Sequence, residues 1–155
     1  PDAVLHRQPI ALHDAVAQLC DYFEGMAEER GITLLNETDG TLVADPQLLR
    51  RALANLIANA LRYGDADSPV RIKSKFTANQ AEISVANTGE PINPEHLPRL
   101  FDRFYRCNSA RSQPGDSGGL GLAIVRSITQ MHGGSVHVHS DSAETLFTLH
   151  FPVGD

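Results

Sequence analysis

The sequence predicts an α+β two-layer sandwich, in which a mixed, mostly antiparallel sheet carries three main helices on one face. Three segments repeat apolar residues at helical spacing, and several others alternate apolar and polar residues as strands do. Some strand segments follow one another directly along the chain. A parallel doubly wound sheet would instead require strict alternation of strands and helices, so the mixed sheet is favoured.

The first third of the chain predicts a short strand, a helix and a second strand. Ile10 and Leu12 alternate with polar neighbours, which is typical of an edge strand. Helical spacing then runs over residues 14–30 and stops at Gly31, a frequent helix-ending residue. Residues 31–36 predict the next strand, and the Asp-Gly pair that follows at positions 39 and 40 predicts a turn.

The central helix has the clearest boundaries. Asp45 followed by Pro46 predicts a helix start, because Asp caps the first turn and Pro suits the first helical position. We expect this helix to reach about Tyr63. The expected elements after it are a hairpin at 70–77 and 81–87, an irregular stretch at 88–118, a helix at 120–132 and a last hairpin at 135–141 and 145–151.

Composition restricts the classes of function. The chain has 155 residues and a net charge of −6, which argues against non-specific nucleic-acid binding. Its apolar runs are far shorter than the roughly 18 residues that a membrane-spanning helix needs. Pro1 stands where an initiator Met would, so we expect a piece of a longer protein, with 1–9 as the end of a linker and 10–155 as one domain. Cys20 and Cys107 have no metal-like spacing, and we interpret them as reduced thiols of a cytosolic domain.

Residues 53–63, LANLIANALRY, place polar side chains on a helix at an unusual spacing. Asn55, Asn59 and Arg62 lie within about 60° of one another around the helix axis. We name these three residues the amide stripe. A solvated helix face is one interpretation, although such faces more often carry Glu, Lys and Gln. Two amides and an arginine also suit a site for Mg²⁺ and phosphate.

Two further segments contain polar or glycine residues where strands and helices meet. Asn87 shares a strand face with Ile83 and Val85 and so faces the core, where an amide needs partners such as a purine edge. The alternative is an Asn that starts a turn. Residues 117–124, SGGLGLAI, put glycines at a helix start, where free N–H groups bind anions. Upstream arginines suggest a phosphate lid, or ordinary surface charge: Arg99, Arg103, Arg106 and Arg111.

Taken in order, these segments resemble the ATP-binding catalytic domain of sensor histidine kinases, in the superfamily of gyrase, the ninety-kilodalton heat-shock chaperone and MutL. Residues 55–63 resemble the N box, 87–92 the G1 box, 101–106 the F box and 118–124 the G2 box of that family. Residues 96–106 are most similar to heavy-metal sensor kinases of the copper/silver and zinc/cadmium/cobalt type. The resemblance extends from about residue 8 to 153.

The resemblance implies a role for each matching residue. Asn59 would bind Mg²⁺, with Asn55 supporting the metal and the phosphates. The remaining expected contacts with ATP are Arg62, Arg106 and Arg111 at the phosphates, Gly119, Leu120, Gly121 and Leu122 around the phosphate tail, Tyr63, Asn87, Gly89, Ile92 and Thr145 at the adenine side, and Phe101 and Phe104 as anchors of the lid.

The chain departs from the family pattern at two places. Asn87 stands where the family usually has Asp, so the group that would accept from the adenine amine is uncharged and discrimination against guanine is less secure. Residues 142–145, SAET, retain only the Thr of the family's Gly-x-Gly-Thr. A third feature concerns chemistry: related hydrolases carry a Glu base at the position of Asn55, and an amide cannot take a proton from water.

The resemblance also implies partners. None of the seven histidines lies in the family's phosphoacceptor sequence, so the acceptor is expected on a preceding dimerisation domain that is missing here. The implied setting is a bacterial inner-membrane protein with a cytoplasmic kinase region and a cognate response regulator. We expect a homodimeric parent and a monomeric isolated domain.

Two alternatives remain open. A degenerate nucleotide-binding module or an anti-sigma-type serine kinase would have the same fold. A metal-binding domain would use His137, His139 and His150, which fall on one face of the last hairpin.

Overall fold

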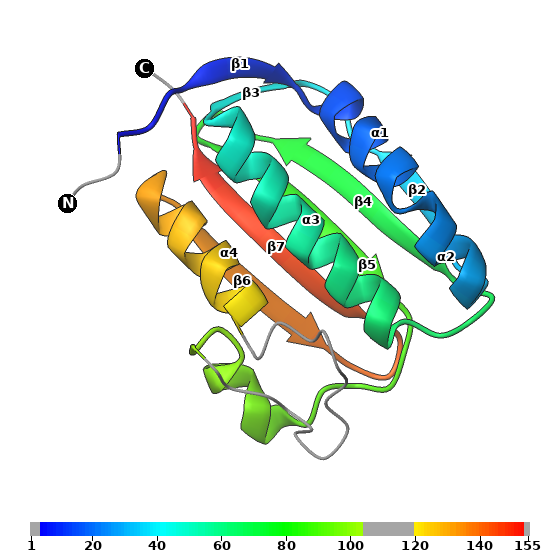
Figure 1. Ribbon diagram of the computed structural model, residues 1–155. Coiled ribbons are helices and arrows are strands. Elements are labelled where there is room, and N and C mark those ends of the chain that lie inside the picture. The colour runs from blue at the N-terminus through cyan, green and yellow to red at the C-terminus, as the bar shows by residue number, and fades with distance from the viewer. Residues whose placement is uncertain (1–3, 104–119, 154–155) are drawn as a thin grey trace.

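A computed structural model of the protein describes residues 4–103 and 120–153, with the side chain of Leu120 left out. It has two layers, a five-stranded sheet and a layer of helices on one of its faces (Figure 1). The strand order is β2-β4-β5-β7-β6. These strands are β2 (Thr33–Glu37), β4 (Pro69–Phe76), β5 (Gln80–Asn87), β6 (Ser135–Ser140) and β7 (Thr145–Pro152).

The pairing pattern confirms the predicted mixed sheet. β2 lies parallel to β4, whereas β4–β5, β5–β7 and β6–β7 are antiparallel. Both predicted hairpins are present, and their strands begin and end within one or two residues of the predicted positions. Buried inward side chains of the central strands alternate with more exposed, mostly polar outward ones, so one sheet face packs against the helices.

Helix α3 (Pro46–Tyr63) runs along the middle of the helical layer, and its start is the predicted one. Asp45 Oδ1 accepts hydrogen bonds from the backbone N–H groups of Gln47 and Leu48, at 3.1 and 3.2 Å. Its apolar face is buried against the sheet: Leu49, Ala52, Leu53, Leu56, Ile57, Ala60 and Leu61. The helix therefore holds the amide stripe at the border between core and solvent.

The N-terminal part differs from the prediction. β1 (Gln8–Ala11) ends before Leu12, which begins α1 (Leu12–Tyr22) and is fully buried. The single helix expected over 14–30 is broken at Phe23, and α2 (Glu24–Arg30) follows. Phe23 leaves helical geometry with ψ near 4° while its ring stays buried, so the chain turns without exposing an aromatic side chain.

A strand that the sequence analysis missed, β3 (Thr41–Ala44), pairs with β1 in a separate two-stranded sheet. The strand predicted at Ile10 is therefore not an edge of the main sheet. Beyond β5, Pro94–Arg99 forms a short 3₁₀ helix, η1, inside the stretch that was expected to be irregular. Within the described ranges, no helix is long and apolar enough to cross a membrane.

Helix α4 (Leu120–Met131) lies beside α3 (Figure 1). A buried histidine just after α4 joins the two helices. His132 Nε2 accepts a hydrogen bond from the Asp45 N–H at 3.1 Å, and its Nδ1 lies 2.8 Å from Ile128 O. Nε2 must be unprotonated to accept, so Nδ1 carries the proton and donates to the carbonyl. The start of α3 is thus tied to the end of α4.

Candidate nucleotide-binding site

The amide stripe and the glycine-rich start of α4 meet in the structure. Asn55 Nδ2 donates a hydrogen bond to Gly121 O at 3.1 Å, although the two residues are 66 positions apart. Asn55 is half-buried, and its Oδ1 remains an acceptor because the NH₂ group makes this bond. The contact joins the segments that resemble the N box and the G2 box.

Asn59 lies one turn further along α3 and is also half-buried. Within the described part of the chain, its side-chain amide has no hydrogen-bond partner, which leaves its oxygen for a ligand. An amide oxygen is a hard neutral donor of the kind that Mg²⁺ accepts. Arg62 and Tyr63 follow at the end of the helix, and both are exposed.

Asn87 lies at the end of β5 and faces the helices, as its alternation with Ile83 and Val85 predicted. Its side chain is only 5% exposed. Thr145 on β7 is its direct cross-strand partner and is equally buried. The two polar residues therefore lie side by side beneath the end of α3, where an otherwise apolar core gives way to polar groups.

Ser140, which the sequence analysis missed, completes this polar row. Its Oγ lies 2.8 Å from Thr145 Oγ1 and accepts a hydrogen bond from the Ile92 N–H, also at 2.8 Å. Ile92, predicted at the adenine side, is half-buried. Ser140 shares the inward face of β6 with Val136 and Val138, and a polar residue in that alternation is the signal that would have identified it.

Gly89 packs against the end of α3. A Cβ atom at this position would lie 2.6 Å from Tyr63 O, closer than real Cβ atoms come, and 3.3 Å from Asn87 Nδ2. Gly64 is similarly confined, because a Cβ atom there would lie 2.7 Å from Ala60 O and 3.5 Å from the Asn87 Cβ. Only glycine lets the backbone segments approach this far. The close approach to the base that the resemblance implies for Gly89 stays a prediction.

Of the aromatic residues expected to anchor the lid, Phe101 is buried. Its ring meets Phe147 of β7 edge-to-face, with centroids 6.0 Å apart. Beside it, Asp102 Oδ1 lies 3.7 Å from Arg126 Nη1 of α4.

Leu122, one of the residues expected around the phosphate tail, is half-buried and packs against the core. The predictions for Phe104, Arg106, Arg111 and Gly119, and that for Cys107, fall outside the described residues; Leu120 is the first residue of α4.

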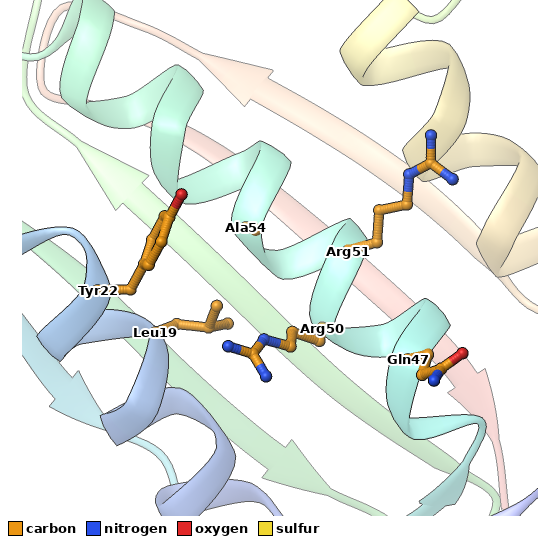
Figure 2. Close-up of a pocket in the computed structure, with 6 residues that line it drawn as sticks. All are labelled: Leu19, Tyr22, Gln47, Arg50, Arg51 and Ala54. Atoms are coloured by element: carbon orange, nitrogen blue, oxygen red, sulfur yellow. The ribbon is translucent and has the colours of Figure 1, made fainter.

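A groove on the other side of α3 holds none of the predicted site residues. It has a volume of about 360 Å³ and lies between α1 and α3 (Figure 2). Its lining consists of Leu19, Tyr22, Gln47, Arg50, Arg51 and Ala54. The amide stripe faces α4 instead, so this groove is distinct from the candidate site.

The histidine cluster does not form a metal centre. The rings of His137 and His150 lie 4.9 Å apart, whereas His139 Nε2 is 3.1 Å from Asp141 Oδ2. In residues 4–103 and 120–153, no three His, Cys, Asp or Glu side chains are grouped to hold a metal ion. Cys20 is a free, half-buried thiol, and burial raises its pKa.

Comparison with known proteins decides the family. Residues 44–155 match the family model described as histidine kinase-, DNA gyrase B-, and HSP90-like ATPase. The chain belongs to this ATPase family. The matched region contains the amide stripe, Asn87 and the start of α4, so the segments that meet in the structure are those of the family's ATP-binding domain.

Individual relatives of the ATPase family agree with this assignment. Sensor histidine kinase CusS of Escherichia coli (strain K12) is 44% identical over 147 residues, which is 94% of this chain and 31% of CusS. The chain therefore spans about a third of this relative's length. Among solved structures, full-length ShkA in complex with AMPPNP has a TM-score of 0.86 at 25% identity, over 98% of this chain and 32% of ShkA. Histidine kinase ThkA in complex with response regulator protein TrrA has a TM-score of 0.79 at 25% identity, over 96% of this chain and 42% of the ThkA chain.

Proposed function

We propose that this chain is the catalytic domain of a two-component sensor histidine kinase, which binds Mg²⁺-ATP and delivers its γ-phosphoryl group to a histidine. The observation that carries the proposal is the hydrogen bond from Asn55 to Gly121 O, since it unites the polar stripe of α3 with the anion-binding start of α4. The sensor kinase CusS and the AMPPNP-bound ShkA support the same activity and the same nucleotide.

The donor set fits a magnesium ion at the phosphate end. Asn59 and Asn55 both have an amide oxygen that the described residues leave for a ligand. Bound there, Mg²⁺ would neutralise charge on the phosphates. The N–H groups at the start of α4, with Arg62 nearby on α3, would hold the rest of the phosphate tail.

The base end is proposed at Asn87 and Thr145. The Asn87 amide offers both a donor and an acceptor, and Thr145 offers a hydroxyl group that Ser140 orients. Gly89 and Tyr63 form the adjoining wall. The site would thus extend from the sheet to the end of α3, with the adenine inside and the phosphates towards α4.

The amide at position 55 suits transfer to a protein better than hydrolysis. It positions groups by hydrogen bonding but has no basic lone pair near neutral pH, so it cannot activate water. A neutral imidazole is already nucleophilic and needs no such activation. The domain then contributes positioning and charge neutralisation, which dominate phosphoryl-transfer catalysis.

The wider assignment is part of the same proposal. Residues 10–155 would be the catalytic domain, and 1–9 would lead from a dimerisation domain that carries the acceptor histidine. The parent would be a homodimeric bacterial inner-membrane protein with this domain in the cytoplasm. The ThkA–TrrA complex supports a response regulator as partner, and residues 96–106 support a heavy-metal signal.

Calorimetric titration of the chain with a nonhydrolysable ATP analogue, with and without Mg²⁺, tests the proposal. We expect binding that Mg²⁺ strengthens, that a GTP analogue does not match, and that Asn59→Ala weakens about tenfold or more only when Mg²⁺ is present. Asn79→Ala is the matched control, because Asn79 is an exposed asparagine in the β4–β5 turn. Failure of the wild-type chain to bind would favour the degenerate module instead.

A further inference from the structure

Arg30, the last residue of α2, caps the C-terminal end of α3. Its Nε donates to Leu61 O at 2.9 Å, and its Nη2 donates to Arg62 O at 3.3 Å and to Gly64 O at 2.6 Å. The last carbonyl groups of a helix have no partner within the helix, and a cation there also complements the helix dipole. One guanidinium group thus satisfies two carbonyl groups of a different helix and the carbonyl group of Gly64, which follows that helix.

The turn that follows Arg30 is hydrogen-bonded to the segment that follows α3. Gly31 adopts the left-handed conformation, with φ of 69°, and its carbonyl oxygen accepts from the Asp67 N–H at 2.8 Å. The Asp65 N–H donates to Thr88 O at 2.7 Å. The end of α2, the end of α3 and the segment after β5 are therefore one hydrogen-bonded unit.

This unit is tightly packed on the side of the proposed base site. A Cβ atom at Gly89 would lie 2.6 Å from Tyr63 O, and one at Gly64 would lie 3.5 Å from the Asn87 Cβ, so the backbone at both glycines passes close to these groups. A displacement of the last turn of α3 would consequently move Tyr63 and change the space beside Asn87. Arg30 itself is exposed and contributes nothing to the apolar core, so its loss should alter position more than folding.

We propose that Arg30 is a positioning residue of the nucleotide site: by binding the last carbonyl groups of α3, it fixes Tyr63 and the base-binding space beside Asn87. It acts through the backbone and touches no atom of the nucleotide. The inference rests on the proposed function, because it requires the base to lie at Asn87.

The position of Arg30 predicts a characteristic binding defect. Arg30→Met keeps most of the side-chain length and removes every donor. We expect it to weaken an ATP analogue and ADP by the same factor, about threefold to tenfold, because the defect lies at the base that both ligands share. The strengthening of ATP-analogue binding by Mg²⁺ should stay unchanged, in contrast to its loss in Asn59→Ala.

Two variants distinguish the capping of α3 by Arg30 from the general effect of removing an exposed arginine. Arg30→Lys keeps the charge but not the planar fork of donors, and should recover part of the affinity. Arg71→Met removes another exposed arginine, which lies on the outward face of β4 and whose Nη1 pairs with Glu37 Oε2 at 2.8 Å. It should bind both nucleotides as the wild type does.

Each titration is performed below the melting temperature of the variant, with circular dichroism confirming the fold. Wild-type affinity in Arg30→Met would overturn the proposal, as would an equal loss in Arg71→Met. If Arg30→Met does not fold, Arg30→Lys and Arg30→Gln carry the test, and wild-type affinity in both overturns it. A wild-type chain that binds no nucleotide overturns the proposed function and this inference together, whereas normal wild-type binding with an unaffected Arg30→Met overturns this inference alone.

Discussion

Substitution of Gly89 by alanine tests the tightest contact in the candidate site. The new Cβ would lie 2.6 Å from Tyr63 O, about 0.8 Å short of an ordinary contact of 3.4 Å. Tyr63 O belongs to the backbone at the end of α3, so rotation of a side chain cannot relieve the clash. Overpacking of this kind costs about 1–3 kcal/mol, and the lower backbone entropy of unfolded alanine offsets about 0.4–1 kcal/mol.

The net expectation for Gly89→Ala is a loss of about 0.5–2 kcal/mol in the free energy of unfolding. Nucleotide affinity should fall about tenfold or more, because Tyr63 and Asn87 both border the new methyl group. Urea denaturation measures the first quantity, and calorimetric titration with a nonhydrolysable ATP analogue measures the second.

Gly25→Ala is the matched control, since a Cβ at Gly25 meets nothing within 4 Å and the residue lies in α2. It should raise stability by up to about 1 kcal/mol and leave affinity unchanged. A Gly89→Ala variant that binds the analogue as tightly as the wild type would refute the view that Gly89 and the end of α3 form a wall of the base site.

Three further predictions concern the elements that hold the site. The pKa of Asp45 is lowered, chiefly by the hydrogen bond from the His6 N–H, so its contribution to stability is present above the unfolded pKa of about 3.9 and lost as pH falls through the lower folded value. Asp45→Asn should therefore flatten the decrease in urea midpoint between about pH 5 and pH 3, and an unaltered slope would contradict this. His132→Phe should cost about 1–3 kcal/mol in urea denaturation, because the Asp45 N–H loses its acceptor, and an unchanged midpoint would show that the bond is dispensable. Phe101→Ala should cost about 3 kcal/mol by the same assay through loss of the contact with Phe147, whereas a cost below about 1 kcal/mol would show that Phe101 is not part of the core.

The elements predicted well are those whose signals are local. The Asp45-Pro46 pair correctly predicted the start of α3, and the alternation of apolar and polar residues correctly predicted both hairpins. The errors come from long-range packing. Residues 41–44 form β3 only because β1 lies beside them, and four residues after a turn gave too short a pattern to recognise.

The candidate site shows the same division. The sequence was sufficient to place Asn55 and Asn59 on one helix face, because the helical period decides which residues share a face. It also placed Asn87 towards the core, because alternate residues of a strand face the same side. It could not show that Asn55 donates to Gly121 O, or that Ser140 joins Ile92 to Thr145, because these contacts depend on how α4 and β6 pack. The capping of α3 by Arg30 was likewise invisible, since nothing in an isolated arginine indicates which carbonyl groups it will reach.

The parallel pairing of β2 with β4 has a consequence for the order in which the protein folds. All of β3 and α3 lies between these two strands along the chain, so β2 cannot join the sheet through a tight turn. The hairpins β4–β5 and β6–β7 close over short loops, whereas β2 must wait until α3 has packed. The N-terminal third, including α2, is then expected to dock last and to detach first in native-state hydrogen exchange. Because Arg30 lies in that third, the earliest partial opening would release the end of α3 while most of the sheet is still intact.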